Sequence, residues 1–155
     1  MVLEIERKFL VHRLPDDLTC HENLELQQGY LSSSENGSEV RLRSENTRRF
    51  LTVKTGSGVA RSIYETELTA VQFDALWPAT SERRIRKTRY ILSWKAHVVE
   101  LDVFHDRLEG LAVAEVEFDS IEDSRAFVPP EWFGREVTDQ EEFKNRNLAI
   151  FGWPA

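Results

Sequence analysis

The chain has 155 residues, of which 41% are hydrophobic and 30% charged, and its net charge is −7. This is the composition of one soluble domain with a core, and the negative balance argues against nucleic acid as a partner. The single cysteine, Cys20, excludes an internal disulfide and a cysteine-based zinc cluster. No segment approaches the roughly 20 apolar residues that cross a membrane, and acids interrupt the first hydrophobic run. We therefore expect no membrane span, no signal peptide and a cytoplasmic location.

Polar and apolar residues alternate through most of the chain, and this period of two predicts eight β-strands. They are expected near residues 3–11, 24–31, 38–44, 49–55, 61–68, 85–93, 97–104 and 111–119. Turn-forming clusters separate several of these strands, most clearly at 32–38 and 55–58.

Three short helices are predicted, each following a residue that can cap a helix N-terminus. They are expected at 70–77 after Thr69, at 121–127 after Ser120 and at 139–150 after Thr138. Eight mostly sequential strands with few helices indicate a mostly β (α+β) fold. We expect an eight-stranded antiparallel barrel, closed or nearly closed, as one domain over residues 1–155.

The strand that opens the chain, "LEIERKFLV", places Glu4, Glu6 and Lys8 on one face and mostly apolar residues on the other. For any one strand, a solvated charged face is the ordinary interpretation. The polar faces of later strands, however, repeat like charges two residues apart, and such neighbours repel unless a ligand neutralises them. These pairs are Arg41 with Arg43, Lys87 with Arg89, Glu100 with Asp102, and Glu115 with Glu117.

If the strands close into a barrel whose apolar outer faces are covered in part by the helices, the charged faces line its inside. Unpaired buried charges are costly, so this interior is expected to be a wet tunnel or a filled site. Clustered arginines and lysines suit phosphate oxygens. Clustered carboxylates without histidine or cysteine favour Mg²⁺ or Mn²⁺. Together they predict a metal-chelated, phosphate-rich substrate.

The segment "EIERK" resembles the Glu-x-Glu-x-Lys motif of the CYTH superfamily, the triphosphate tunnel metalloenzymes. Further segments resemble the family in the same order along nearly the whole chain: "QQGYL", "EVRLR", "LTVKT", "YETEL", "RKTRY", "VELDVF", "EVEF" and "EEFKNRNLA". The resemblance implies an eight-stranded antiparallel barrel around a charged tunnel. It is closest to short bacterial members that hydrolyse inorganic triphosphate (tripolyphosphate) to pyrophosphate and phosphate, and it therefore implies a divalent-metal-dependent triphosphatase.

The resemblance also implies roles for individual residues. The implied metal ligands are Glu4, Glu6 and Glu117, with Asp102 and Glu115 contributing to the same Mg²⁺ or Mn²⁺ ion or to a second one. The implied substrate-binding residues are Lys8, Tyr30, Arg41, Arg43, Lys54, Lys87 and Arg89. The implied catalytic residues are Lys8, Glu65, Lys87, Asp102 and Glu115.

Within this set, Glu65 would orient a basic side chain or the attacking water. A carboxylate among Asp102, Glu115 and Glu117 would accept the proton of that water, and Lys87 or Arg89 would stabilise the leaving phosphate.

Two other functions stay open at this point. One is another CYTH activity, either a class IV adenylate cyclase or a thiamine or nucleoside triphosphatase, and the other is a non-enzymatic polyphosphate- or nucleotide-binding barrel. Arg61 and Glu67 alternate in step with the residues expected to face the tunnel. Glu100 matches the family pattern less well than Asp102, and Lys144 is expected on the solvent side of a helix. The apolar outer faces and four tryptophans are compatible with a homodimer.

Overall fold

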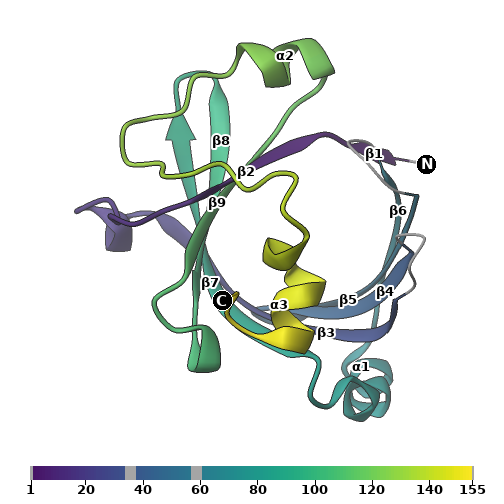
Figure 1. Ribbon diagram of the computed structural model, residues 1–155. Helices are drawn as coiled ribbons and strands as arrows, with labels where there is room; N and C mark the ends of the chain where they lie inside the picture. The colour runs from purple at the N-terminus through teal and green to yellow at the C-terminus, as the bar shows by residue number, and fades with distance from the viewer. Residues whose placement is uncertain (1, 34–37, 57–60, 155) are drawn as a thin grey trace.

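The computed structural model describes residues 2–33, 38–56 and 61–154, which form one antiparallel sheet with short helices around it (Figure 1). The strand order is β1-β6-β5-β4-β3-β7-β8-β9-β2. The two edge strands, β1 (Val2–Glu4) and β2 (Glu6–Leu10), are successive parts of the chain, so the sheet curls until its edges meet at Ile5. The predicted mostly β, antiparallel barrel fold is confirmed.

The remaining strands follow the predicted order. They are β3 (Glu22–Ser33), β4 (Glu39–Glu45), β5 (Arg48–Thr55), β6 (Arg61–Glu67), β7 (Arg84–Trp94), β8 (His97–Phe104) and β9 (Ala112–Glu117). The turns predicted at 32–38 and 55–58 lie largely outside the described residues.

The strand predicted at 3–11 is two strands, because its halves pair with opposite edges of the sheet. β1 pairs with β6 and β2 pairs with β9. Between them the carbonyl of Ile5 accepts a hydrogen bond of 2.8 Å from the backbone N–H of Phe118. The interruption does not change the predicted face, since Glu4, Glu6 and Lys8 all line the same pocket.

Two of the predicted helices begin at their predicted caps. Thr69 and Gln72 form a reciprocal capping box at α1 (Ala70–Leu76), which continues into the 3₁₀ helix η2 (Trp77–Thr80). The Ser120 hydroxyl accepts from the backbone N–H of Asp123 at the start of α2 (Ile121–Ala126). Two further 3₁₀ helices are η1 (Leu18–Cys20) and η3 (Asp106–Leu108).

The single helix predicted at 139–150 is wrong. The chain forms the 3₁₀ helix η4 (Glu141–Phe143) and, after an extended Lys144, α3 (Asn145–Phe151). Thr138 does not cap a helix because its hydroxyl has other partners: it accepts from the Lys8 backbone N–H and donates to Glu136. Local capping preference therefore yields here to tertiary contacts with β2.

The core has two parts, and one of them closes an end of the barrel. The first packs phenylalanines, including Phe127 and Phe133, against β2, β8 and β9. The second joins Leu148 of α3 and Phe143 to Tyr30 and other side chains on the inward faces of β2, β3, β7, β8 and β9. Figure 1 shows α3 across the space that the sheet encircles. The interior is therefore charged over part of its length only, and apolar beneath α3.

Among the described residues, no helix has both the length and the apolar character needed to cross a membrane.

Candidate functional site

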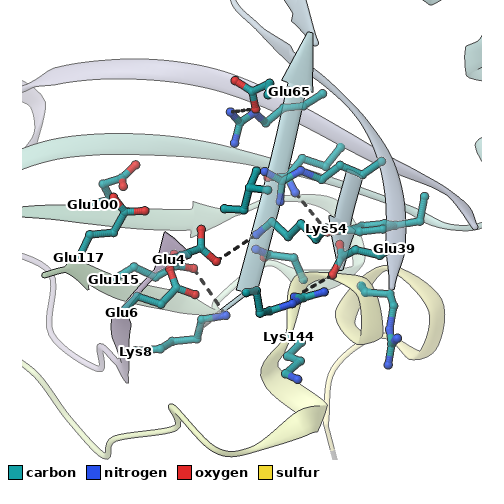
Figure 2. A pocket seen from close by; sticks show the side chains of 18 of the residues that line it. Glu4, Glu6, Lys8, Glu39, Lys54, Glu65, Glu100, Glu115, Glu117 and Lys144 are labelled. Carbon is teal, nitrogen blue, oxygen red and sulfur yellow. Dashed lines mark hydrogen bonds and ion pairs between the residues drawn. The ribbon is translucent and has the colours of Figure 1, made fainter. Parts of the chain in front are cut away.

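A pocket of about 380 Å³ lies inside the curled sheet and is lined mostly by charged side chains (Figure 2). All but two of the predicted site residues line it. Those that do are Glu4, Glu6, Lys8, Tyr30, Arg41, Arg43, Lys54, Glu65, Arg89, Glu115 and Glu117. The two outside the lining are Lys87 and Asp102, which lie buried behind it.

Three carboxylates form the acidic side of the pocket. Glu4, Glu6 and Glu117 each place an oxygen within 4.8 Å of the other two. Burial raises the pKa of Glu6 well above its ordinary value, and Glu115 and Glu4 raise it further. Burial followed by Glu4 and Glu115 also raises the pKa of Glu117. Carboxylates that raise one another's pKa in this way are short of positive charge, and an all-oxygen set of this kind fits a hard divalent cation.

Lys54 and Lys8 lie beside this cluster (Figure 2). Lys54 Nζ is 3.3 Å from Glu4 Oε1, and Lys8 Nζ is 3.5 Å from Glu115 Oε1. Burial would lower the pKa of Lys8, but Glu115 and neighbouring acids outweigh it and raise the pKa. Lys8 therefore stays protonated inside the pocket wall.

Glu115 differs from the other acids because cations surround it. Burial would raise its pKa, but Lys8, Arg89 and Lys87 outweigh burial and hold the pKa far below its ordinary value. Its side chain is 11% exposed. Its charge is thus already balanced by the protein.

Asp102 is the anchor of a buried ion cluster. It accepts 2.7 Å and 2.9 Å hydrogen bonds from Arg89 and lies 2.7 Å from Lys87 Nζ. Burial lowers the pKa of Lys87 to about 8, although Asp102 opposes this shift. A two-point contact fixes the guanidinium plane, so Asp102 aims Arg89 into the pocket, where Arg89 also lies 2.6 Å from Glu100.

The basic side of the pocket is formed by β4. The Nε atoms of Arg41 and Arg43 are buried and have no hydrogen-bond partner among the described residues. Arg43 lies 2.9 Å from Glu45 and 3.5 Å from Glu65, and Glu65 also accepts a hydrogen bond of 2.9 Å from Thr52. Buried donors without a partner are costly, and this fits a site that receives an anion.

Several pocket residues were not identified as site residues from the sequence. Arg61 and Glu100 line the pocket. Glu67 lies on the same face of β6 as Arg61, but it is exposed and pairs with Arg48. Lys144 also lines the pocket, contrary to the solvent-facing position expected for it. The other lining residues that were not predicted to belong to a site are Gln28, Glu39, Glu45, Ile63, Thr138, Asp139, Asn145 and Arg146. Strand alternation could have identified Glu39 and Glu45, because they lie on the same face of the strand as Arg41 and Arg43.

Comparison with known proteins agrees with this architecture. The model of the CYTH domain matches residues 3–145. An inorganic triphosphatase of Nitrosomonas europaea is 46% identical over 150 residues, which cover 95% of this chain and 97% of that protein. An inorganic triphosphatase of Acetivibrio thermocellus is 33% identical over 148 residues, covering 94% of this chain and 92% of that one.

Among solved structures, the crystal structure of an inorganic triphosphatase is 44% identical in sequence and superposes with a TM-score of 0.73. The superposition covers 97% of this chain and 96% of that one. The match to the family model and the similarity over nearly the full length of both relatives lead to one conclusion. This chain belongs to the CYTH family.

Proposed function

We propose that this protein is a divalent-metal-dependent triphosphatase that hydrolyses inorganic triphosphate to pyrophosphate and phosphate inside the charged pocket. The observation that carries the proposal is a pocket in which three clustered carboxylates, with Lys54 paired to one of them, face two arginines whose Nε donors have no partner among the described residues. Its chemistry suits a metal-chelated polyphosphate. The relatives at 46% and 33% identity, both named inorganic triphosphatases, support the same activity.

The metal belongs with Glu4, Glu6 and Glu117, and Mg²⁺ and Mn²⁺ are the candidates. A divalent cation bound there would neutralise phosphate charge and lower the pKa of a coordinated water. Glu115 and Asp102, also predicted as ligands, have their charges balanced by lysine and arginine. We therefore assign Glu115 to holding Lys8 and Asp102 to positioning Arg89. A second ion, as the sequence predicts, would draw its oxygen ligands chiefly from the triphosphate.

The cationic side chains would hold the phosphate chain. Arg41 and Arg43 offer their Nε donors, Arg89 is aimed by Asp102, and Lys8 and Lys54 lie where the acids and the substrate meet. Because phosphoryl transfer depends on positioning and on charge neutralisation, this arrangement is suited to stabilise the oxygens that gain charge. Tyr30 lines the same pocket, and the side chain of Gln28 donates to its hydroxyl.

Hydrolysis requires a water that attacks a terminal phosphorus while the bond to the bridging oxygen breaks, releasing pyrophosphate. We assign the orientation of this water to Glu65, whose side chain is 37% exposed in the pocket and is fixed by Thr52 and Arg43. Of the three predicted proton acceptors, Asp102 and Glu115 pair with lysine or arginine, which leaves Glu117 as the candidate in the pocket, beside the metal that it would hold. Lys87 lies fully buried behind the pocket, so we assign it to positioning Arg89 through Asp102 rather than to direct contact with the substrate.

The lining favours an inorganic substrate over a nucleotide or thiamine triphosphate. Among the described residues, Tyr30 is the only aromatic side chain in the lining, and it is 2% exposed. A nucleobase or thiamine ring would therefore find no open aromatic surface on which to stack.

The test is phosphate release from tripolyphosphate, ATP and thiamine triphosphate, each with Mg²⁺, Mn²⁺ or excess chelator. Glu4→Gln and Glu117→Gln are the test variants, and Glu67→Gln, an exposed carboxylate outside the pocket, is the matched control. The proposal predicts fast, metal-dependent release from tripolyphosphate that both test variants lose and the control keeps. Preferential hydrolysis of ATP, formation of cyclic AMP, or metal-dependent binding without turnover would contradict it.

A further inference from the structure

Lys87 is a buried cation that does not itself reach the pocket. Its side chain is 0% exposed, and it lies outside the pocket lining. Its ammonium nitrogen lies 2.7 Å from Asp102 and donates a hydrogen bond of 3.4 Å to the side-chain oxygen of Asn145. Asn145, the first residue of α3, does line the pocket. It therefore links the buried cation to the pocket interior.

The contact with Lys87 decides which way the amide of Asn145 faces. An ammonium group carries donors only, so it is the oxygen of the amide that faces it. The amide nitrogen, with its two N–H donors, then points away from Lys87. Among the residues that the structure describes, no acceptor receives a hydrogen bond from this nitrogen. Two donors on the pocket wall are thus open to a ligand.

The backbone on both sides of Asn145 is held in place. Before it, the carbonyl of Phe143 accepts a hydrogen bond of 3.4 Å from Lys8 Nζ. After it, Leu148 is 0% exposed in the core, and its carbonyl accepts a hydrogen bond of 3.2 Å from Arg107. The amide of Asn145 is therefore presented to the pocket from a fixed backbone as well as in a fixed orientation.

We propose that Asn145 binds the triphosphate: its amide nitrogen donates to a phosphoryl oxygen, and Lys87 orients the amide by holding its oxygen. This inference rests on the proposed triphosphatase function and adds a substrate-binding residue to the same pocket. Phosphoryl oxygens are charged acceptors, and hydrogen bonds to charged acceptors are stronger than neutral ones. The substrate contact that the sequence implied for Lys87 is thus made by Asn145.

A simpler role for Asn145 is to hold Lys87 in place and nothing more. Asn145→Asp separates the two roles, because it keeps the shape of the side chain and the oxygen that accepts from Lys87. It replaces the amide nitrogen with a carboxylate oxygen, which cannot donate and which repels a phosphoryl oxygen. If Asn145 only holds Lys87, this variant binds triphosphate as the wild type does. If the amide donates to the substrate, binding is weakened.

The experiment measures kcat and KM for tripolyphosphate, with Mg²⁺, in the wild type, Asn145→Asp and Asn145→Ala. KM should rise at least about tenfold in Asn145→Asp, because a hydrogen bond to a charged group is lost and a like charge is added. Asn145→Ala loses the donor without adding a charge, so its KM should rise by less. KM does not depend on how much of a preparation is folded, so partial misfolding of a variant does not change it.

Gln140→Glu is the matched control. Gln140 belongs to the same C-terminal segment, and its side-chain oxygen accepts a hydrogen bond of 3.2 Å from Arg135. The substitution again converts an amide beside a cation into a carboxylate, but Gln140 lies outside the pocket lining. Its KM should equal that of the wild type.

A wild-type KM in Asn145→Asp would overturn the inference, and so would a rise of the same size in Gln140→Glu. If Asn145→Asp does not fold, a KM in Asn145→Ala at or below the wild-type value overturns it, because the amide then contributes nothing to binding. Each of these results leaves the proposed function intact. If the wild type fails to hydrolyse tripolyphosphate at all, the proposed function itself fails, and calorimetric titration of tripolyphosphate with Mg²⁺ into the same variants tests the contact alone.

Discussion

Glu115 and Glu117 lie two residues apart on the same face of β9, and both line the pocket, yet their surroundings act on them in opposite directions. Burial raises the pKa of Glu117, and Glu4 raises it further. Burial would also raise the pKa of Glu115, but Lys8 and Arg89 outweigh it and keep that carboxylate ionised.

The pocket therefore has two acidic regions that differ in how far neighbouring cations neutralise their carboxylates. The carboxylate cluster of Glu4, Glu6 and Glu117 is short of positive charge, whereas Glu115 and Asp102 have theirs supplied by lysines and arginines. Only the first region gains from an added cation. The presence of many acids in one pocket thus does not by itself indicate where a metal binds, and the distribution of their partners does.

The most severe test of this difference is Glu117→Gln. We expect triphosphatase activity to fall at least about 100-fold, because the metal loses a direct ligand. The stability of the metal-free protein should not fall, since the substitution removes a carboxylate that its neighbours repel. Phosphate release and thermal unfolding in chelator measure the two effects. A variant with a lower unfolding temperature and an unchanged specific activity would contradict the assignment.

Asp102→Asn should give the opposite pattern, with its main effect on stability. The substitution leaves Lys87 buried without its carboxylate and takes from Arg89 one of its two, and breaking a buried ion pair costs about 3 to 5 kcal/mol of unfolding free energy. Urea denaturation measures it. Asp106→Asn is the control, because Asp106 pairs with Arg86 at an exposed position, and its unfolding midpoint should match the wild type. Equal midpoints for the two variants would show that the buried cluster is not structurally important.

Metal should stabilise the wild-type protein through the carboxylate cluster. At a free Mn²⁺ concentration 100 times the dissociation constant, binding to the native state alone contributes about 2.7 kcal/mol. Thermal unfolding with Mn²⁺ and with chelator measures this difference. It should vanish in Glu117→Gln and persist in Glu67→Gln, and a shift that survives in Glu117→Gln would place the ion elsewhere.

The smallest expected effect is on the pH dependence of stability in chelator. Because the pKa of Glu6 is raised on folding, the native state binds more protons than the unfolded state above the ordinary value of 4.5. Stability contributed by the protonated carboxyl is then lost as pH rises through this window. Urea denaturation at several pH values should show a steeper loss in the wild type than in Glu6→Gln. Parallel curves would contradict a raised pKa.

Strand periodicity was sufficient to predict which side chains face the pocket, but not how far along the barrel the pocket extends. Glu65 and Glu67 have the same parity, yet Glu65 lines the pocket and Glu67 lies beyond it. Parity also placed Lys87 and Asp102 inside correctly, but could not show that they neutralise each other behind the pocket wall.

The C-terminal segment could not be predicted in the same way. Thr138 has the preference of a helix cap, but its contact with Lys8 decides its conformation. The extended Lys144 then separates η4 from α3 and lines the pocket. Both outcomes depend on where the segment crosses the barrel end, which no local pattern encodes.

The most direct test of the account is a calorimetric titration of Mn²⁺ into the wild type, Glu117→Gln and Glu115→Gln, without substrate. The account predicts that Glu117→Gln loses Mn²⁺ binding while Glu115→Gln retains it, because only Glu117 belongs to the cluster that lacks positive charge. Loss of binding in Glu115→Gln with retention in Glu117→Gln would contradict the account and move the ion to the region that we assign to lysine and arginine.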